Sequence, residues 1–207
     1  MSLPSPRHPE GPYRVCFVCL GNICRSPVAE VVARAQLAEA GLGGAVIVDS
    51  AGTGDWHIGD QMDSGARAEL ARGGYDGEAH RARQYEPSWL ANRDLVLAMD
   101  HSNLKNLKSL ARTDHPGSAS EGSGGVVPPG QHGVSPSTGF RGVVSPGQHG
   151  DSDRMRLFGD VTGLDGADVP DPYGGGPDEF ARVLALLESA MPALIAQLAE
   201  LLKPAAP

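Results

Sequence analysis

The residues best suited to chemistry are a cysteine and an arginine near the N-terminus, Cys19 and Arg25, which enclose five other residues. They belong to the segment Cys-Leu-Gly-Asn-Ile-Cys-Arg-Ser, residues 19–26. A loop of this length can surround one tetrahedral oxyanion with its backbone N–H groups. The planar guanidinium of Arg25 can bind two oxygens of that anion, whereas a lysine could not. Because the same positive groups favour the thiolate of Cys19, the segment predicts nucleophilic attack on a phosphate.

The elements around this loop must bring the thiol and the guanidinium together. An apolar run at 15–19 predicts a buried strand that ends at Cys19, and a helix-like stretch follows at 27–40. The positive end of that helix would add to the attraction for an anion. Further short elements are predicted as strands at 45–49, 94–99 and 155–158 and as a helix at 102–110.

This alternation predicts an α/β fold, a single Rossmann-like domain in which a central four-stranded parallel sheet is flanked by helices on both faces. Ligands bind beyond the C-terminal ends of the strands in such sheets, where Cys19 falls. A last helix is predicted to begin at Pro177, with one apolar stripe that packs on the sheet. Pro192 lies inside it and is expected to kink or break it near Ser189.

Two segments do not fit the domain pattern. The Pro-rich residues 1–12 are expected to be a disordered tail, so that the domain occupies 13–207. Residues at about 113–153 are expected to be a flexible insertion, because more than half of them are Gly, Pro or Ser and few are apolar. The insertion contains a near-repeat, 125–133 and 142–150, whose function the sequence does not decide.

Composition excludes several classes of protein. The formal net charge of −8 argues against nucleic acid as a partner. No apolar stretch is expected to be long enough to cross a membrane, and no secretory signal is recognised, so no membrane partner is expected. The three cysteines lie within nine residues, which is no disulfide framework, and a free thiolate predicts a cytoplasmic location.

A second motif supplies a proton donor. If Cys19 attacks a phosphate monoester, the leaving oxygen needs a proton, and Asp171 in Asp-Val-Pro-Asp-Pro-Tyr-Gly, 168–174, is the candidate acid. The flanking Pro170 and Pro172 would stiffen the loop that presents it.

Together, the cysteine motif and the Asp-Pro-Tyr motif resemble those of the low-molecular-weight protein-tyrosine phosphatases. The resemblance covers about 14–112 and 155–202, and the intervening Ser-Ala-Gly-Thr, 50–53, and His-Arg-Ala-Arg-Gln, 80–84, match in order and spacing. It implies a tyrosine phosphatase in which Cys19 forms a phosphocysteine, Arg25 stabilises the transferred phosphoryl group and Asp171 is the general acid and then base.

The same resemblance implies roles for the surrounding residues. The backbone N–H groups of the loop would bind the phosphate, and Trp56 and Tyr173 would be aromatic walls for the substrate ring. Polar side chains would hold the loop in shape. The residues concerned are Leu20, Gly21, Ile23, Cys24 and Arg25 for the N–H groups, and Asn22, Ser26, Ser50 and His80 for the polar network.

The expected partners are phosphotyrosine proteins, with inorganic phosphate and oxyanions such as vanadate as inhibitors, and no metal or cofactor is expected. Gly-Gly-Gly, 174–176, stands where many relatives continue with a second tyrosine, so one wall is expected to be smaller.

Cys24 is close enough to Cys19 in sequence for a reversible protective disulfide, which is a hypothesis.

Three alternatives have distinguishing features. A thioredoxin-coupled arsenate reductase would need further cysteines after Cys24, and the chain has none. A protein-arginine phosphatase on the same scaffold would carry a threonine where Ile23 stands. A phosphotyrosine-binding pseudophosphatase would be expected to lack Cys19, Arg25 or Asp171.

Overall fold

The computed structural model describes residues 2–113 and 150–203. The N-terminal half follows the predicted alternation of strands and helices, with two additions that the sequence pattern did not reveal, α2 and η1. The elements in chain order are β1 (Tyr13–Cys19), α1 (Arg25–Glu39), β2 (Val46–Gly52), α2 (Ser64–Arg72), η1 (Pro87–Asn92), β3 (Leu95–Ala98), α3 (His101–Thr113), η2 (Asp151–Arg154), β4 (Met155–Leu157), α4 (Phe158–Val161) and α5 (Pro177–Leu201).

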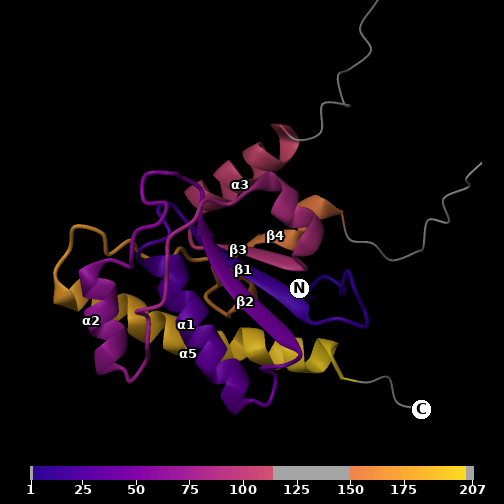
Figure 1. Cartoon of the computed structure of the whole chain (residues 1–207). Helices are drawn as coiled ribbons and strands as arrows, with labels where there is room; N and C mark the ends of the chain where they lie inside the picture. Colours follow the sequence, from indigo (N-terminus) through magenta and orange to yellow (C-terminus); the bar gives the residue numbers. More distant parts are fainter. Residues whose placement is uncertain (1, 114–149, 204–207) are drawn as a thin grey trace, which may run out of the picture.

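The four strands form one sheet in the order β2-β1-β3-β4, and all neighbouring pairs are parallel (Figure 1). In the register, Cys19 at the end of β1 is paired with Gly52 at the end of β2. The chain proceeds from β1 to one side and then returns to the other side at β3, so the strand order reverses beside β1. Ligand sites in open α/β sheets lie at such a reversal, beyond the C-terminal strand ends.

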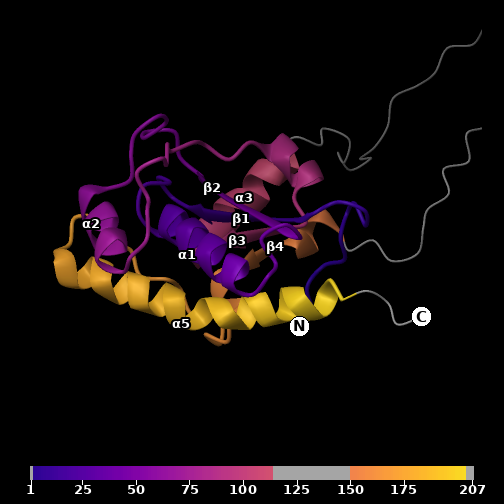
Figure 2. The same cartoon turned by 60° about the horizontal axis from the view of Figure 1, so that its bottom comes forward.

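Helices cover both faces of the sheet, as predicted. Figure 2 shows α1 and α5 on one side and α3 on the other. One apolar cluster joins alternate residues of β1 and β3, such as Phe17 and Leu97, to α1 and α5. The intervening residues, such as Val18 and Val96, belong to a second cluster with α3 and η1. The two central strands, β1 and β3, are therefore buried on both faces, which explains why their sequences are almost continuously apolar.

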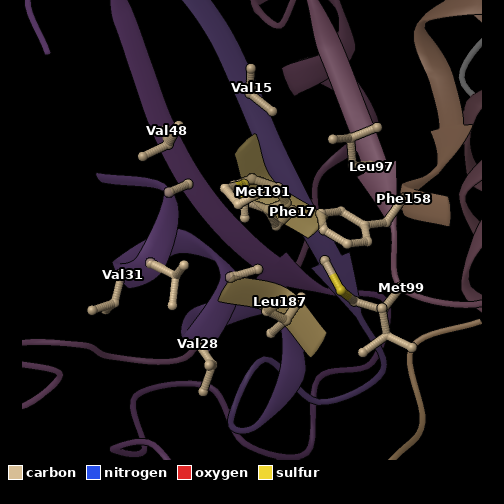
Figure 3. Packing of buried hydrophobic residues seen from close by; sticks show 14 of the residues in the cluster. Val15, Phe17, Val28, Val31, Val48, Leu97, Met99, Phe158, Leu187 and Met191 are labelled. Carbon is tan, nitrogen blue, oxygen red and sulfur yellow. The ribbon is translucent and has the colours of Figure 1, made fainter. Parts of the chain in front are cut away.

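Large side chains fill the space between β1 and α5. Phe17 meets Phe158 edge to face, with ring centroids 6.2 Å apart, and Leu187 and Met191 of α5 lie over this pair (Figure 3). These residues are fully buried. The packing fixes the C-terminal end of β1, and therefore Cys19, against the helical layer.

Pro192 was predicted to kink or break the last helix, and it does not break it, because α5 continues through it to Leu201. A proline has no N–H, so the carbonyl four residues earlier, that of Glu188, loses its helical donor. The side chain of Gln36 in α1 replaces it: its Nε2 donates to the Glu188 carbonyl at 3.2 Å. A tertiary contact thus satisfies the group that the local sequence leaves unpaired.

By length and mean hydropathy, α5 alone among the described helices meets the criteria for crossing a membrane, which corrects the expectation that no segment would. The apolar face of this helix is nevertheless packed in the protein. Phe180, Leu187 and Leu194 are buried in the cluster that α5 shares with α1 and the sheet. This is the pattern of a core helix.

The prediction of a disordered tail is wrong for residues 2–12, which lie against the N-terminal ends of the strands. Leu3 is buried. The hydroxyl of Tyr13 donates to the carbonyl of Pro4 at 2.9 Å, within the same buried region. Arg154, which precedes β4, donates to the carbonyl of Ser5 at 3.0 Å. The segment is ordered because distant residues satisfy its backbone carbonyls.

The predicted flexible insertion falls largely outside the described residues, at 114–149. Its expected boundaries are corrected at both ends. Thr113 belongs to α3, and Asp151 and Ser152 belong to η2. Asp151 also forms an ion pair with Arg7 of the N-terminal segment.

The role of Gln36 can be tested by a double-mutant cycle. In the wild-type background, Gln36→Ala should lower the free energy of unfolding by about 1 kcal/mol, because the Glu188 carbonyl loses its donor. In a Pro192→Ala background the alanine supplies a backbone N–H and restores a helical bond, so the same substitution should cost only a few tenths of a kcal/mol. Urea unfolding of the four proteins measures both values. Equal costs in the two backgrounds would contradict this assignment.

Candidate active site

Cys19 is the last residue of β1, and its thiol lies at the base of a pocket. The sulfur lies 3.1 Å from the hydroxyl oxygen of Ser26 and accepts a hydrogen bond from the backbone N–H of Asn22 at 3.3 Å. These contacts place two polar hydrogen-bonding groups beside the sulfur and fix its position at the end of β1.

The pocket collects most of the residues that the sequence singled out, and one that it did not, His57. Asn22, within the loop, and Ser26, which follows it, are completely buried and do not line the pocket. The lining residues are Cys19, Leu20, Gly21, Ile23, Cys24, Arg25, Trp56, His57, Asp171 and Tyr173.

Asn22 holds the loop from below. Its backbone adopts φ 56°, in the left-handed region, where only glycine and, less often, asparagine are readily accommodated. Its side-chain nitrogen donates to the hydroxyls of Ser26 at 3.0 Å and Ser50 at 2.9 Å. The Asn22 side-chain oxygen accepts the backbone N–H of Arg83 at 2.9 Å. Ser26 lies inside α1, past the N-cap residue Cys24, so its hydroxyl serves this network rather than a cap.

Two further side chains complete the network. The imidazole Nε2 of His80 donates to the backbone carbonyl of Asn22 at 2.8 Å. Burial lowers the pKa of His80, and this hydrogen bond only partly opposes that shift. The hydroxyl of Ser50 donates to Glu30 at 2.6 Å. Glu30 and Arg83 were not predicted as site residues, because both lie at helix or loop positions where a charged side chain is ordinarily solvated.

The end of β2 allows the loop to lie this close. A Cβ atom on Gly52 would lie 2.7 Å from the backbone carbonyl oxygen of Leu20. Only a residue without a side chain fits there. The backbone N–H groups of Thr53 and Gly54 donate to the carbonyls of Cys19 and Leu20, both at 2.9 Å.

Arg25, the first residue of α1, is 3% exposed and is held between two carboxylates. Its Nη1 donates to Asp100 at 2.6 Å and to the carbonyl of Val169 at 3.2 Å. Its Nη2 donates to Asp171 at 2.7 Å. Its Nε is buried and has no partner among the described residues. Asp100 was not predicted as a site residue, although it lies only two residues after the end of the buried strand β3.

The loop that carries Asp171 is fixed to the end of β3 and the start of α3. The N–H of Val169 donates to the carbonyl of Met99 at 2.8 Å. One oxygen of Asp168 accepts the backbone N–H of His101 at 3.0 Å, and it lies 2.6 Å from the imidazole Nδ1 of the same residue. These contacts bring the predicted acid to the pocket from the far end of the sequence.

The predicted aromatic walls stand at the pocket mouth. Trp56 is 71% exposed and Tyr173 is 63% exposed, and both line the pocket. The Trp56 ring lies so close to the backbone of Gly54 that a Cβ atom on this glycine would overlap with the ring. His57, next to Trp56 in the chain, contacts the loop that carries Tyr173: the centroids of the His57 and Tyr173 rings are 6.3 Å apart. The Nδ1 of His57 lies 3.0 Å from a carboxylate oxygen of Asp60.

Cys24, the second cysteine of the loop, is surrounded by groups that disfavour its thiolate. Burial raises the pKa of the Cys24 thiol, and the carboxylate of Asp63 adds to this effect, so Cys24 stays protonated. Cys24 and Cys19 are free thiols in the structure, and their reversible disulfide remains a prediction. In residues 2–113 and 150–203, no group of three potential ligands is placed to hold a metal.

The dependence of the loop on Asn22 generates a test. Asn22→Gly and Asn22→Ala both remove the side-chain hydrogen bonds, so each should lower kcat on the order of 100-fold through misplacement of the loop. Asn22→Ala should also lower the free energy of unfolding by about 1–2 kcal/mol more than Asn22→Gly, since alanine is strained at this φ. Aryl phosphate kinetics and urea unfolding measure the two effects, and equal stability of the variants would contradict the backbone argument.

Comparisons with known proteins identify the family of this chain. The sequence model of the family described as "Low molecular weight phosphotyrosine protein phosphatase" matches residues 14–116 and 145–203. A low molecular weight protein-tyrosine-phosphatase of Streptomyces coelicolor is 41% identical over 192 residues, which cover 91% of this chain and 94% of that protein.

Solved structures share the fold. A protein tyrosine phosphatase of Entamoeba histolytica with Hepes in the active site superimposes with a TM-score of 0.68 and 30% identity, over 91% of this chain and 97% of that one. YwlE, described as an arginine phosphatase, has a TM-score of 0.67 at 22% identity over 90% of this chain and 96% of its own, which is a likeness of fold alone. The chain therefore belongs to the low molecular weight phosphotyrosine protein phosphatase family and is a protein-tyrosine phosphatase.

Proposed function

We propose that this chain hydrolyses phosphotyrosine in proteins through a phosphocysteine, with Cys19 as nucleophile, Arg25 as phosphate-binding residue and Asp171 as general acid and base. The observation that carries the proposal is that one pocket contains all three, while the buried Nε of Arg25 lacks a partner among the described residues. A buried donor without an acceptor is costly unless a ligand satisfies it. A pocket that already holds a thiol at its base and an acid at its rim points to a phosphate monoester as that ligand.

Arg25 has donors to spare for such a ligand. A guanidinium carries five N–H hydrogens, of which Nη1 uses two on Asp100 and Val169 and Nη2 uses one on Asp171. The Nε–H and one Nη2–H therefore remain for two phosphate oxygens, which a guanidinium binds side by side. The carboxylates balance the charge of Arg25 while the pocket is empty, and they orient the guanidinium.

Two steps complete the reaction. The Cys19 thiolate attacks phosphorus, so that the S–P bond forms as the bond to the tyrosine oxygen breaks, and Asp171 gives its proton to that oxygen. A water molecule then attacks phosphorus, Asp171 takes its proton, the S–P bond breaks and phosphate leaves. Both steps concentrate negative charge on phosphoryl oxygens that face Arg25 and the loop N–H groups.

The pocket favours an aryl substrate. Trp56 and Tyr173 offer flat apolar faces, and Ile23, which is 8% exposed, adds an apolar side chain at the base. A phosphorylated guanidinium would need polar partners where Ile23 stands. Inorganic phosphate and vanadate, which occupy the volume of the phosphoryl group, are expected to inhibit competitively, and a reducing compartment such as the cytoplasm would preserve the thiol.

The roles of Cys19 and Asp171 predict different responses to the leaving group. Asp171→Asn should lower kcat for phosphotyrosine peptides by about 100- to 10,000-fold, because the tyrosine oxygen leaves poorly without a proton. The loss should be smaller for p-nitrophenyl phosphate, whose phenolate leaves readily. Cys19→Ser should lower both rates by roughly a thousandfold or more. Initial rates in the presence of a chelator measure these effects.

A phosphoarginine peptide of the same sequence is the matched control. Preference for phosphotyrosine that both substitutions abolish would support the proposal. Preference for phosphoarginine would contradict the role of Ile23. Wild-type inactivity on every substrate, with vanadate still bound, would favour a binding module instead.

A further inference from the structure

The exposed apolar side chains of this protein gather at the mouth of the phosphate pocket. Five large hydrophobic residues are exposed in the described part of the chain, and four of them belong to the loops around the pocket. Leu20 is 42%, Ile58 59%, Tyr173 63% and Trp56 71% exposed. Contiguous exposed apolar surface of this kind marks a site that contacts another molecule.

Ile58 extends this surface beyond the pocket itself. It lies in the tight turn that presents Trp56 and His57, because the N–H of Ile58 donates to the carbonyl of Asp55 at 3.4 Å and the N–H of Asp60 donates to that of His57 at 2.9 Å. A phosphotyrosine ring between Trp56 and Tyr173 would leave Ile58 to meet the neighbouring residues of the substrate chain. Ile58 therefore belongs to the same turn as two residues that line the phosphate pocket, Trp56 and His57.

The charges on the same loops have one sign. The loop at 53–63 contains Asp55, Asp60 and Asp63 and no lysine or arginine, and the loop at 168–176 contains Asp168 and Asp171 and none either. Asp55 and Asp60 are exposed. The guanidinium of the pocket is buried at its base. The phosphate thus meets positive charge at the base of the pocket, whereas the flanking residues of a substrate meet carboxylates.

We propose that the mouth of the pocket selects phosphotyrosine segments whose neighbouring residues are basic and apolar, and that it disfavours acidic neighbours. The inference rests on the phosphatase activity proposed above and concerns which proteins that activity reaches. Two unit charges about 10 Å apart in water change an equilibrium roughly twofold. Exchange of one flanking glutamate for lysine should therefore raise kcat/KM roughly fourfold at low salt.

The test uses two phosphotyrosine peptides that differ only in lysine or glutamate at the positions next to phosphotyrosine. The full chain should hydrolyse the lysine peptide faster at about 20 mM salt, and the preference should fall to near unity at about 1 M, where the screening length is about 3 Å. A preference that came from shape or apolar contact alone would persist in high salt, and this result would contradict the electrostatic part of the proposal.

Charge reversal locates the effect. Asp55→Lys should abolish or reverse the ratio of the two kcat/KM values. Glu200→Lys is the matched control, since it makes the same change in net charge on an exposed residue in the last turn of α5. It lies roughly 35 Å along that helix from its first turn, which is more than one screening length at about 20 mM salt, where that length is roughly 20 Å. The ratio should keep its wild-type value in this variant.

The outcomes separate the two proposals. Equal hydrolysis of both peptides at low salt, a preference for the glutamate peptide, or the same loss of preference in Asp55→Lys and Glu200→Lys would overturn the inference while leaving the phosphatase activity intact. Failure to hydrolyse p-nitrophenyl phosphate, which has no flanking residues, would overturn the proposed function and the inference with it.

Discussion

The site depends on one buried residue in an uncommon backbone conformation, Asn22. Its left-handed φ turns the chain between Cys19 and Arg25, and hydrogen bonds from three other segments hold it there. The N–H group of Asn22 donates to the sulfur of Cys19, so the same residue also fixes the loop against the nucleophile that we propose. The hydrogen bonds of Asn22 therefore hold the loop in its conformation before an anion binds, so that binding need not supply the free energy of ordering it.

Charge balance is the second constraint. A buried guanidinium is unfavourable unless it is paired, and Asp100 and Asp171 both pair with Arg25. Asp100 follows the end of β3, and Asp171 lies in the loop before α5, so the two ion pairs also join segments that are distant in the chain. The residual donors of Arg25 face a pocket whose lining residues include no lysine and no second arginine. The arrangement that pairs the guanidinium thus also leaves donors for the proposed phosphate.

Specificity is organised in a separate layer around this centre. The phosphate-binding loop belongs to the sheet and α1, whereas the mouth is built from exposed turns that bear Trp56, Ile58 and Tyr173. Such turns tolerate exchange of side chains because little of the core depends on them.

The sequence by itself determined the parallel α/β fold, because strand and helix periodicity is a local property. It also predicted the chemistry of the loop and the acid candidate from the Cys-to-Arg spacing and the Asp-Pro-Tyr motif. Only the tertiary structure decided that α5 continues through Pro192, that residues 2–12 are ordered, and that Asp100, Glu30, Arg83 and His57 belong to the site. Each of these depends on a partner far away in the chain: Gln36 for the helix, Arg154 for the N-terminal segment and Arg25 for Asp100. A local pattern records which groups need partners, whereas the packing of the chain determines which groups supply them.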